Sequence, residues 1–137
     1  MAKDVFHACV REALEKDGWS ITHDPYTIKV GEIPMEIDLG AERLIAAERG
    51  TDIIAVEIKS FIGRSPVHDF HEAIGQFGNY RSALRFKEPE RLLFLAIPEE
   101  VFLNFFQRPF VQIRLEEENI KLLVFDPYLN IISTWIR

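Results

Sequence analysis

Apolar and polar residues along the first half of the chain follow the spacings of helices and strands in turn. Apolar side chains recur at helical spacing in the first segment and alternate with polar ones in the segments after it. In chain order, the pattern predicts a helix over 4–17, short strands over 19–22 and 26–30, a break over 31–35, and a hairpin of strands 38–47 and 52–60 joined by a turn at 48–52.

The second half predicts alternating helices and strands. In chain order these are a helix ending near 86 that starts at Pro66 or near Asp69, a strand over 91–97, a helix opened by Pro98, a segment over 110–118 that fits a helix or a strand, and a closing hairpin of strands 121–125 and 131–136. The strand over 91–97 is almost continuously apolar, as a central parallel strand is. The chain is therefore predicted to form one α/β domain over residues 1–137, with a mixed sheet flanked by helices.

Two opposite charges follow an apolar run in the predicted hairpin. Ile53-Ile54-Ala55-Val56 leads into Glu57-Ile58-Lys59, and strand alternation places Glu57 and Lys59 on the same face. A charge at the end of a buried strand is costly unless it is paired or binds a metal. A Glu–Lys pair on a strand that reaches solvent is the simpler explanation. A chemical explanation needs a second carboxylate, and Asp38 on the partner strand can supply it.

The register of the hairpin decides whether Asp38 reaches Glu57. A two-residue turn allows two registers, which pair Glu57 with either Gly40 or Glu42. Asp38 then lies about 7–13 Å from Glu57 along the strand, although on the same sheet face. A bulge or kink at Gly40 would close that distance. Glu36 and Glu42 are the rival acidic residues if Asp38 faces away.

Two carboxylates beside an ammonium group suit the hydrolysis of a phosphodiester. Carboxylate oxygens are the ligands that Mg²⁺ and Mn²⁺ prefer, and such an ion neutralises phosphate charge and acidifies a bound water. In this interpretation Asp38 and Glu57 bind the metal, and Lys59 orients the water or stabilises charge on the phosphate.

The long helix after the hairpin offers two more polar groups. Gln76 and Tyr80 are one turn apart and therefore lie on a common helical face, where an amide and a phenol can hold a water or a phosphate oxygen. The simpler interpretation is a boundary glutamine and a tyrosine at the edge of the core. Gly75 and Gly78 weaken a helix, which predicts a close approach of this helix to the sheet.

These residues resemble a known group of nucleases. Asp38, followed 19 positions later by Glu57-Ile58-Lys59, resembles the PD-(D/E)xK nuclease superfamily, with Ile37 where the motif has proline. Gln76 to Tyr80 is similar to the Q-x-x-x-Y motif of RecB-type nucleases. Nearly the whole chain resembles the XisH family, the fdxN-element excision controlling factors. The segments that carry this resemblance are 16–26, 38–43, 55–61, 75–80 and 135–137.

The resemblance implies a three-layer restriction-endonuclease-like fold and a Mg²⁺- or Mn²⁺-dependent endonuclease. The site it implies has Asp38 and Glu57 as metal ligands, Lys59 as the water-activating group, Gln76 and Tyr80 completing the site, and Glu12 of the first helix as a candidate extra ligand. The implied partners are DNA, the companion excision factor XisI and a site-specific recombinase, and a homodimer is a candidate assembly. A toxin or defence nuclease is a third, weaker alternative.

The overall charge favours a different function within the same family. The net charge is −6 at pH 7, and an acidic surface binds DNA poorly without a local basic patch. A non-catalytic regulatory protein that keeps the nuclease fold and acts through protein partners therefore remains an alternative. Calorimetry with Mn²⁺ separates the nuclease from the regulatory protein, and expression toxicity that depends on Glu57 would support the toxin.

Compartment signals in the sequence are weak but consistent with one another. Cys9 is the only cysteine, so an intramolecular disulfide is excluded and a reducing compartment is expected. No apolar run has the length of a membrane span, and the first residues lack the features of a signal peptide. The sequence therefore predicts a cytoplasmic protein without a membrane association.

Overall fold

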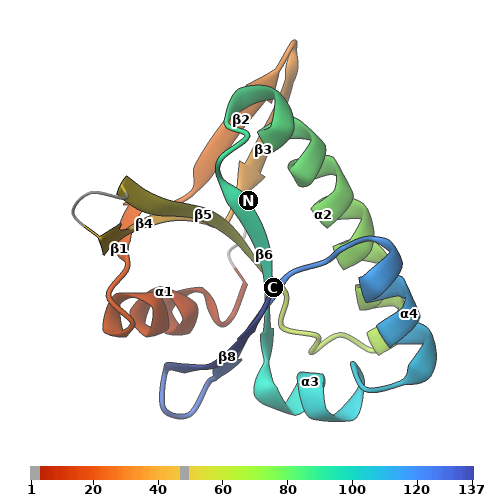
Figure 1. Cartoon of the computed structure of the whole chain (residues 1–137). Helices are drawn as coiled ribbons and strands as arrows, with labels where there is room; N and C mark the ends of the chain where they lie inside the picture. The colour runs from red at the N-terminus through yellow and green to blue at the C-terminus, as the bar shows by residue number, and fades with distance from the viewer. Residues whose placement is uncertain (1–3, 47–49) are drawn as a thin grey trace.

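The computed structural model describes the backbone of residues 4–46 and 50–137 and the side chains of residues 4–41 and 52–137. Its elements, drawn in Figure 1, are α1 (His7–Lys16), β1 (Ser20–His23), β2 (Tyr26–Val30), β3 (Ile33–Ile37), β4 (Leu39–Ala46), β5 (Gly50–Ile58), α2 (Pro66–Lys87), β6 (Leu92–Pro98), α3 (Glu99–Asn104), α4 (Pro109–Glu117), β7 (Leu122–Asp126) and β8 (Ile131–Ile136). Within these described residues, no helix is both long enough and apolar enough to cross a bilayer.

A six-stranded mixed sheet forms the centre of the molecule, in the order β1-β4-β5-β6-β7-β8. β6 pairs in parallel with β5 on one side and with β7 on the other, whereas the remaining neighbours are antiparallel. The continuous apolar run in β6 thus belongs to a central parallel strand, as predicted. β2 and β3 form a separate two-stranded sheet that projects at the top of Figure 1.

Helices cover both faces of this sheet (Figure 1). On one face, Val10 and Leu14 of α1 pack against Ile54 and Val56 of β5. On the other face, the side chains of α2 and α4 pack over Ala55 and the alternate residues of β6 and β7. The alternation of β5 therefore assigns Ile54, Val56 and Ile58 to the α1 face and directs Ala55 and Glu57 toward α2.

Three local predictions are settled by the structure. Residues 31–35 are not a break: β3 begins at Ile33 and pairs with β2, and Gly31, at φ +60°, opens a two-residue turn between them. The Gly-Glu pair in this turn was misread as a simple interruption. The long helix takes its earlier start, because the Ser65 hydroxyl accepts a hydrogen bond from the His68 N–H at 3.1 Å. The segment over 110–118 is helical.

Both predicted registers of the β4–β5 hairpin are wrong. Gly40 lies opposite Ala55 and Leu39 lies opposite Val56, so Asp38 stands across from Glu57 at the point where β4 begins. Ala46 pairs with Gly50, so the connection is longer than two residues, and the register shifts by one further residue between Leu44 and Ala46. The first two residues of the predicted turn, 48 and 49, lie outside the described residues, whereas residues 50–52 belong to β5. The irregularity is therefore in β4 near the turn, whereas it was expected at Gly40.

The structure explains the glycine at position 40 by close packing, because its neighbours leave no room for a side chain. A Cβ added there would lie 3.0 Å from His23 Nδ1 and 3.0 Å from Tyr26 Cδ2, whose rings pack edge to face above the strand. We expect Gly40→Ala to lower the free energy of unfolding by roughly 1–3 kcal/mol, because one of these rings must move. Urea denaturation of the purified variant measures this loss, and a variant as stable as the wild type would contradict the packing.

The helical glycines supply the matched control. A Cβ at Gly75 or Gly78 would meet nothing within 4 Å, so the predicted close approach of the helix to the sheet at these positions is wrong. Both residues lie inside α2, where alanine costs less backbone entropy than glycine. Gly75→Ala should accordingly raise the free energy of unfolding by about 0.5–1 kcal/mol in the same assay.

Candidate active site

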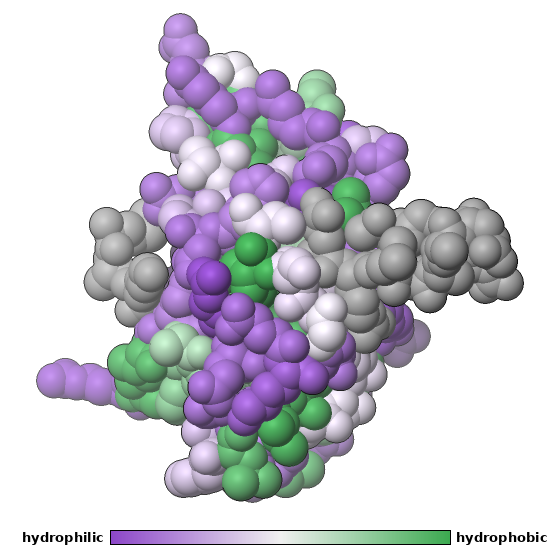
Figure 2. Space-filling view, turned by 90° about the vertical axis from the view of Figure 1, so that its left-hand side faces the viewer, coloured by the Kyte–Doolittle hydropathy of each residue, from purple (hydrophilic) through white to green (hydrophobic). Residues whose placement is uncertain are grey.

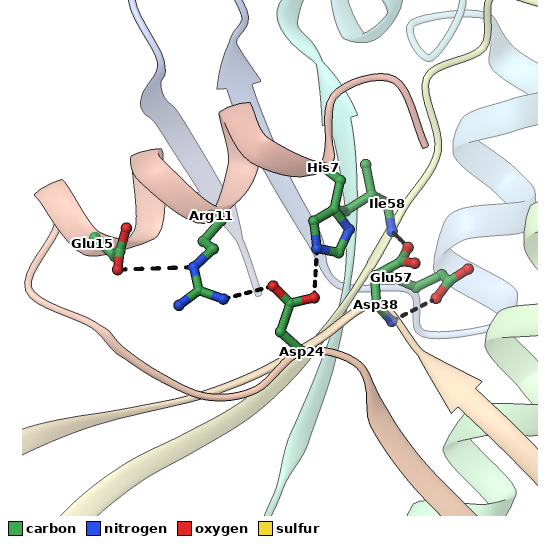
Figure 3. Close-up of polar contacts among 7 residues, drawn as sticks. All are labelled: His7, Arg11, Glu15, Asp24, Asp38, Glu57 and Ile58. Atoms are coloured by element: carbon green, nitrogen blue, oxygen red, sulfur yellow. Dashed lines mark hydrogen bonds and ion pairs between the residues drawn. The ribbon is translucent and has the colours of Figure 1, made fainter. Parts of the chain in front are cut away.

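Asp38 and Glu57 meet where β4 separates from β5. Asp38 lies on the bend between β3 and β4, and Glu57 is the last residue but one of β5. The Ile58 N–H donates to Asp38 Oδ2 at 2.8 Å, and the Asp38 N–H donates to Glu57 Oε1 at 3.3 Å (Figure 3). Each carboxyl group therefore accepts a hydrogen bond from a backbone N–H on the opposite strand. These two bonds extend the β4–β5 pairing beyond its last backbone pair, Leu39 and Val56. The structure brings the two predicted acids together without the 7–13 Å offset.

The two carboxyl groups interact strongly enough to change how they ionise. Burial, followed by the negative charge of Asp38, raises the pKa of Glu57 to about 9. Burial also raises the pKa of Asp38, although the Ile58 N–H and the nearby His7 act in the opposite direction. Two carboxylates this close cannot both ionise without a neutralising charge. At neutral pH the pair thus holds one proton, with Glu57 as the protonated partner that hydrogen-bonds to Asp38.

A cavity of about 420 Å³ opens onto this pair. It includes all five residues that the sequence singled out, because Lys59, Gln76 and Tyr80 also line it. The remaining lining residues are Asp4, His7, Asp24, Pro25, Glu36 and Ile58. Residues from the first 40 positions, from β5 and from α2 therefore converge on one concave site, as candidate active sites commonly require.

Lys59 shares the cavity with Glu57, as strand alternation predicts. Its backbone N–H continues the ladder by donating to the Ala96 carbonyl at 3.0 Å. Its side chain is 18% exposed, and the ammonium group forms an ion pair with Glu72 of α2. The positive charge of Lys59 also partly offsets the raised pKa of Glu57. Lys59 is thus near the acidic pair, but in this structure Glu72 holds its ammonium group.

Tyr80 and Gln76 present neutral polar groups from α2. Burial raises the pKa of Tyr80 to about 12, and the negative charges of Glu57, Asp38 and Glu36 contribute in that order. The phenol therefore stays protonated at physiological pH and remains a hydrogen-bond donor. Gln76 lies one turn before it and lines the same cavity. The two α2 residues that line the cavity therefore supply hydrogen-bond donors and no charge.

His7, which no sequence pattern singles out, also belongs to the cavity. Its Nε2 lies 2.7 Å from Asp24 Oδ1, and the other oxygen of Asp24 accepts from Arg11 at 2.6 Å (Figure 3). Because a carboxylate only accepts, Nε2 carries the proton. His7 Nδ1 is buried and has no hydrogen-bond partner among the described residues. Figure 3 places this ring between Asp24 and Asp38, so His7 links the Asp24–Arg11 pair to the acidic site.

Other acidic residues take different positions. Asp4 lines the cavity, and its Oδ2 accepts from the Ser60 N–H at 3.0 Å. Glu36 also lines it, whereas the side chain of Glu42, the second rival acid, lies outside the described residues. Glu12 does not line it: its carboxylate contacts Asn130 at 3.0 Å and Lys16 at 3.1 Å on the other side of α1. Glu12 is therefore poorly placed as an extra metal ligand.

The donor set can be tested against a divalent ion. Among the described residues, no group of three or more His, Cys, Asp or Glu side chains is arranged as a metal site, which disfavours a metal enclosed by protein ligands. Mg²⁺ is commonly bound through one or two carboxylates and completes its shell with waters and phosphate oxygens. Asp38 and Glu57, which share a proton in the absence of a cation, fit that mode of binding.

Comparisons with known proteins give one consistent result. A family model described as XisH protein matches residues 1–133. The solved structure of an XisH family protein from Nostoc punctiforme is 46% identical over 98% of this chain and 100% of that chain, with a TM-score of 0.89. An fdxN element excision controlling factor protein from Anabaena variabilis matches with the same identity, coverage and TM-score. No curated protein matches the sequence.

Proposed function

Because the chain belongs to the XisH family, we propose that it controls the excision of a DNA element through a site for divalent-metal-dependent phosphodiester hydrolysis. The relative from Anabaena variabilis is an fdxN element excision controlling factor, which supports the first part of this proposal. The mixed sheet with helices on both faces is compatible with the restriction-endonuclease-like fold of PD-(D/E)xK nucleases. The site itself supports the hydrolytic part.

One observation carries the hydrolytic proposal. Asp38 and Glu57 lie on different segments, yet each binds the other's backbone and the pair retains a proton to about pH 9. Such a pair costs stability, and strained acidic pairs in a cavity are commonly functional. Asp38 and Glu57 would hold Mg²⁺ or Mn²⁺ in place of that proton. When bound, the ion supplies charge neutralisation at the phosphate and a lower pKa for the attacking water.

The remaining lining residues have distinct roles in this proposal. Lys59, once released from Glu72, stabilises negative charge on the phosphate or orients the water. The Gln76 amide and the Tyr80 phenol bind phosphate oxygens or water from the α2 side. His7, oriented by Asp24, lines the same cavity and adds a polar ring to it. Substrate entry and the exchange of the Glu72 ion pair are therefore expected to occur together.

A nuclease assay tests the proposal. The protein is incubated with single-stranded, duplex and branched DNA in Mg²⁺ or Mn²⁺, and fragments are separated on denaturing gels. We expect Lys59→Ala to reduce cleavage by about 10²-fold, because a charge-stabilising group is lost. Lys87→Ala removes an exposed lysine outside the cavity and should cleave as the wild type does. Equal cleavage by Lys59→Ala, purified identically, would identify a contaminating nuclease.

The charge of the cavity favours a second candidate function, that of a regulatory factor. Lys59, which lines the cavity, already binds Glu72, and Arg11 binds Asp24, another residue of the cavity lining. The whole chain also has a net charge of −6, and an acidic surface attracts DNA weakly. In this version the chain acts on DNA through a companion such as XisI and a recombinase, as a monomer or a homodimer. A folded protein without Mn²⁺ binding at Asp38 and Glu57 would favour it.

A further inference from the structure

A second cavity, with a different lining, lies beside the acidic site. It has a volume of about 530 Å³ and lies at the carboxyl ends of the three parallel strands, where Ser60 follows β5, Pro98 ends β6 and Asp126 ends β7. In open α/β sheets this edge is a common position for binding sites. We refer to this cavity as the β-edge groove.

The walls of the β-edge groove are apolar and unusually exposed. Ile62, Leu103 and Tyr128 line it with 65%, 60% and 87% of their surface exposed. Phe6, Phe61, Val101 and Phe105 form the deeper part. Figure 2 shows hydrophobic side chains gathered at the lower end of the molecule, the end where Figure 1 places α3 and the turn between β7 and β8. Apolar surface of this kind marks an interaction site more often than chance exposure.

The charged residues of the groove all have the same sign. Glu99, Glu100 and Asp126 line it, and no lysine or arginine does so among the described residues. Within the same part of the chain, neither Glu99 nor Glu100 forms an ion pair. We propose that the β-edge groove docks a segment of a partner protein that carries an apolar anchor side chain flanked by lysine or arginine.

Charge complementarity favours a basic partner segment over a second copy of the chain, DNA or a membrane surface. A second copy of the chain has a net charge of −6, so like charges would meet at the acidic rim. DNA and an anionic membrane surface are repelled for the same reason. A basic amphipathic segment instead buries the exposed Ile62 and Leu103 and neutralises Glu99 and Glu100. Anchoring of an apolar side chain in a pocket is the usual source of affinity in such interfaces.

The groove lies next to the acidic cavity but does not depend on its function. Ser60 lines the groove, and its N–H donates to Asp4, which lines the acidic cavity. Phe6 and His7, adjacent in sequence, line the groove and the acidic cavity respectively. A segment docked in the groove is thus able to shift residues of the acidic cavity through these neighbours. Binding at the groove itself requires no metal and no catalysis.

Two designed peptides test the docking proposal by fluorescence anisotropy without metal. Both are fluorescein-labelled 14-residue amphipathic helices with leucine on one face, and they carry either lysine or glutamate at the flanking positions. We expect the lysine peptide to bind at least tenfold more tightly than the glutamate peptide, and Leu103→Glu to weaken its binding at least tenfold. Exchanging both Glu99 and Glu100 for lysine should reverse the preference between the peptides.

The control is Phe110→Glu, which alters an apolar residue of α4 that is equally exposed, at 62%, but does not line the groove. It should bind the lysine peptide as the wild type does. Equal binding of the two peptides, no binding of the lysine peptide up to 1 mM, or equal effects of Leu103→Glu and Phe110→Glu would overturn the proposal. A dimer in sedimentation that Leu103→Glu dissociates would overturn it in favour of a second copy.

Discussion

Glu57→Gln is expected to abolish Mn²⁺ binding and, in metal-free buffer, to make the protein more stable at neutral pH. The amide keeps the shape of the side chain and can donate to Asp38 as the protonated Glu57 does. It cannot supply the second negative oxygen ligand, so Mn²⁺ affinity should fall by about 100-fold or more. The same substitution removes the acid whose pKa burial and Asp38 raise to about 9.

The gain in stability follows from proton linkage. Between the unfolded pKa of 4.5 and the folded value of about 9, folded Glu57 retains a proton that the unfolded chain releases. The free energy of unfolding of the wild type therefore falls as pH rises through this window. Below the window, Glu57 is protonated in both the folded and the unfolded chain, and its burial causes no such loss of stability. Glu57→Gln lacks this loss, so at pH 7 it should exceed the wild type by roughly 1–3 kcal/mol, with the difference disappearing near pH 4.

Calorimetric titration with Mn²⁺ and urea denaturation across pH 4–9 measure the two effects separately. Wild-type affinity for Mn²⁺ should itself rise by up to about tenfold per pH unit between pH 6 and 8, since the ion replaces the proton. Glu12→Gln is the matched control, because Glu12 contacts Asn130 and Lys16 away from the cavity. An unchanged Mn²⁺ affinity in Glu57→Gln, or a loss in Glu12→Gln, would contradict the placement of the site.

What the sequence could predict of this site is limited to spacing within single elements. Alternation along β5 is enough to place Glu57 and Lys59 on one face, and a helical turn is enough to bring Gln76 beside Tyr80. All four residues line the acidic cavity of the structure. The continuous apolar run of β6 likewise identifies a central parallel strand, which the structure places between β5 and β7.

The hairpin register and the side-chain partners in the site depend on contacts between different elements. The sequence within a single element does not indicate such contacts. The register of the β4–β5 hairpin follows from the length of its connection and from an irregularity between Leu44 and Ala46, and no turn residue indicates either one. His7 joins the site because Asp24, 17 residues away, accepts from its ring. The pairing of Lys59 with Glu72 likewise depends on how α2 lies across the sheet. Side-chain partners were therefore less predictable than the faces on which the residues lie.

Phe106→Ala should lower the free energy of unfolding by about 3–5 kcal/mol, the range for loss of a fully buried aromatic side chain. Phe106 is completely buried, and its ring centroid lies 5.3 Å from Phe61, 5.8 Å from Phe105 and 5.9 Å from Phe70. These edge-to-face contacts join the segment after β5 to α2 and to the end of α3. Alanine leaves a cavity at the centre of this cluster, which the surrounding rings only partly fill.

The position of Lys59 depends on the same cluster. Phe61 follows Lys59 by two residues and has a φ of 58°, a left-handed conformation that a phenylalanine adopts only when its surroundings enforce it. Loss of the Phe106 ring removes part of that enforcement, so the segment after β5 should exchange amide hydrogens faster than the β6 core.

Phe110→Ala, at a position 62% exposed on α4, should change stability by less than about 0.5 kcal/mol. Equal losses in the two variants, measured by urea denaturation, would show that the cluster does not hold this segment in place.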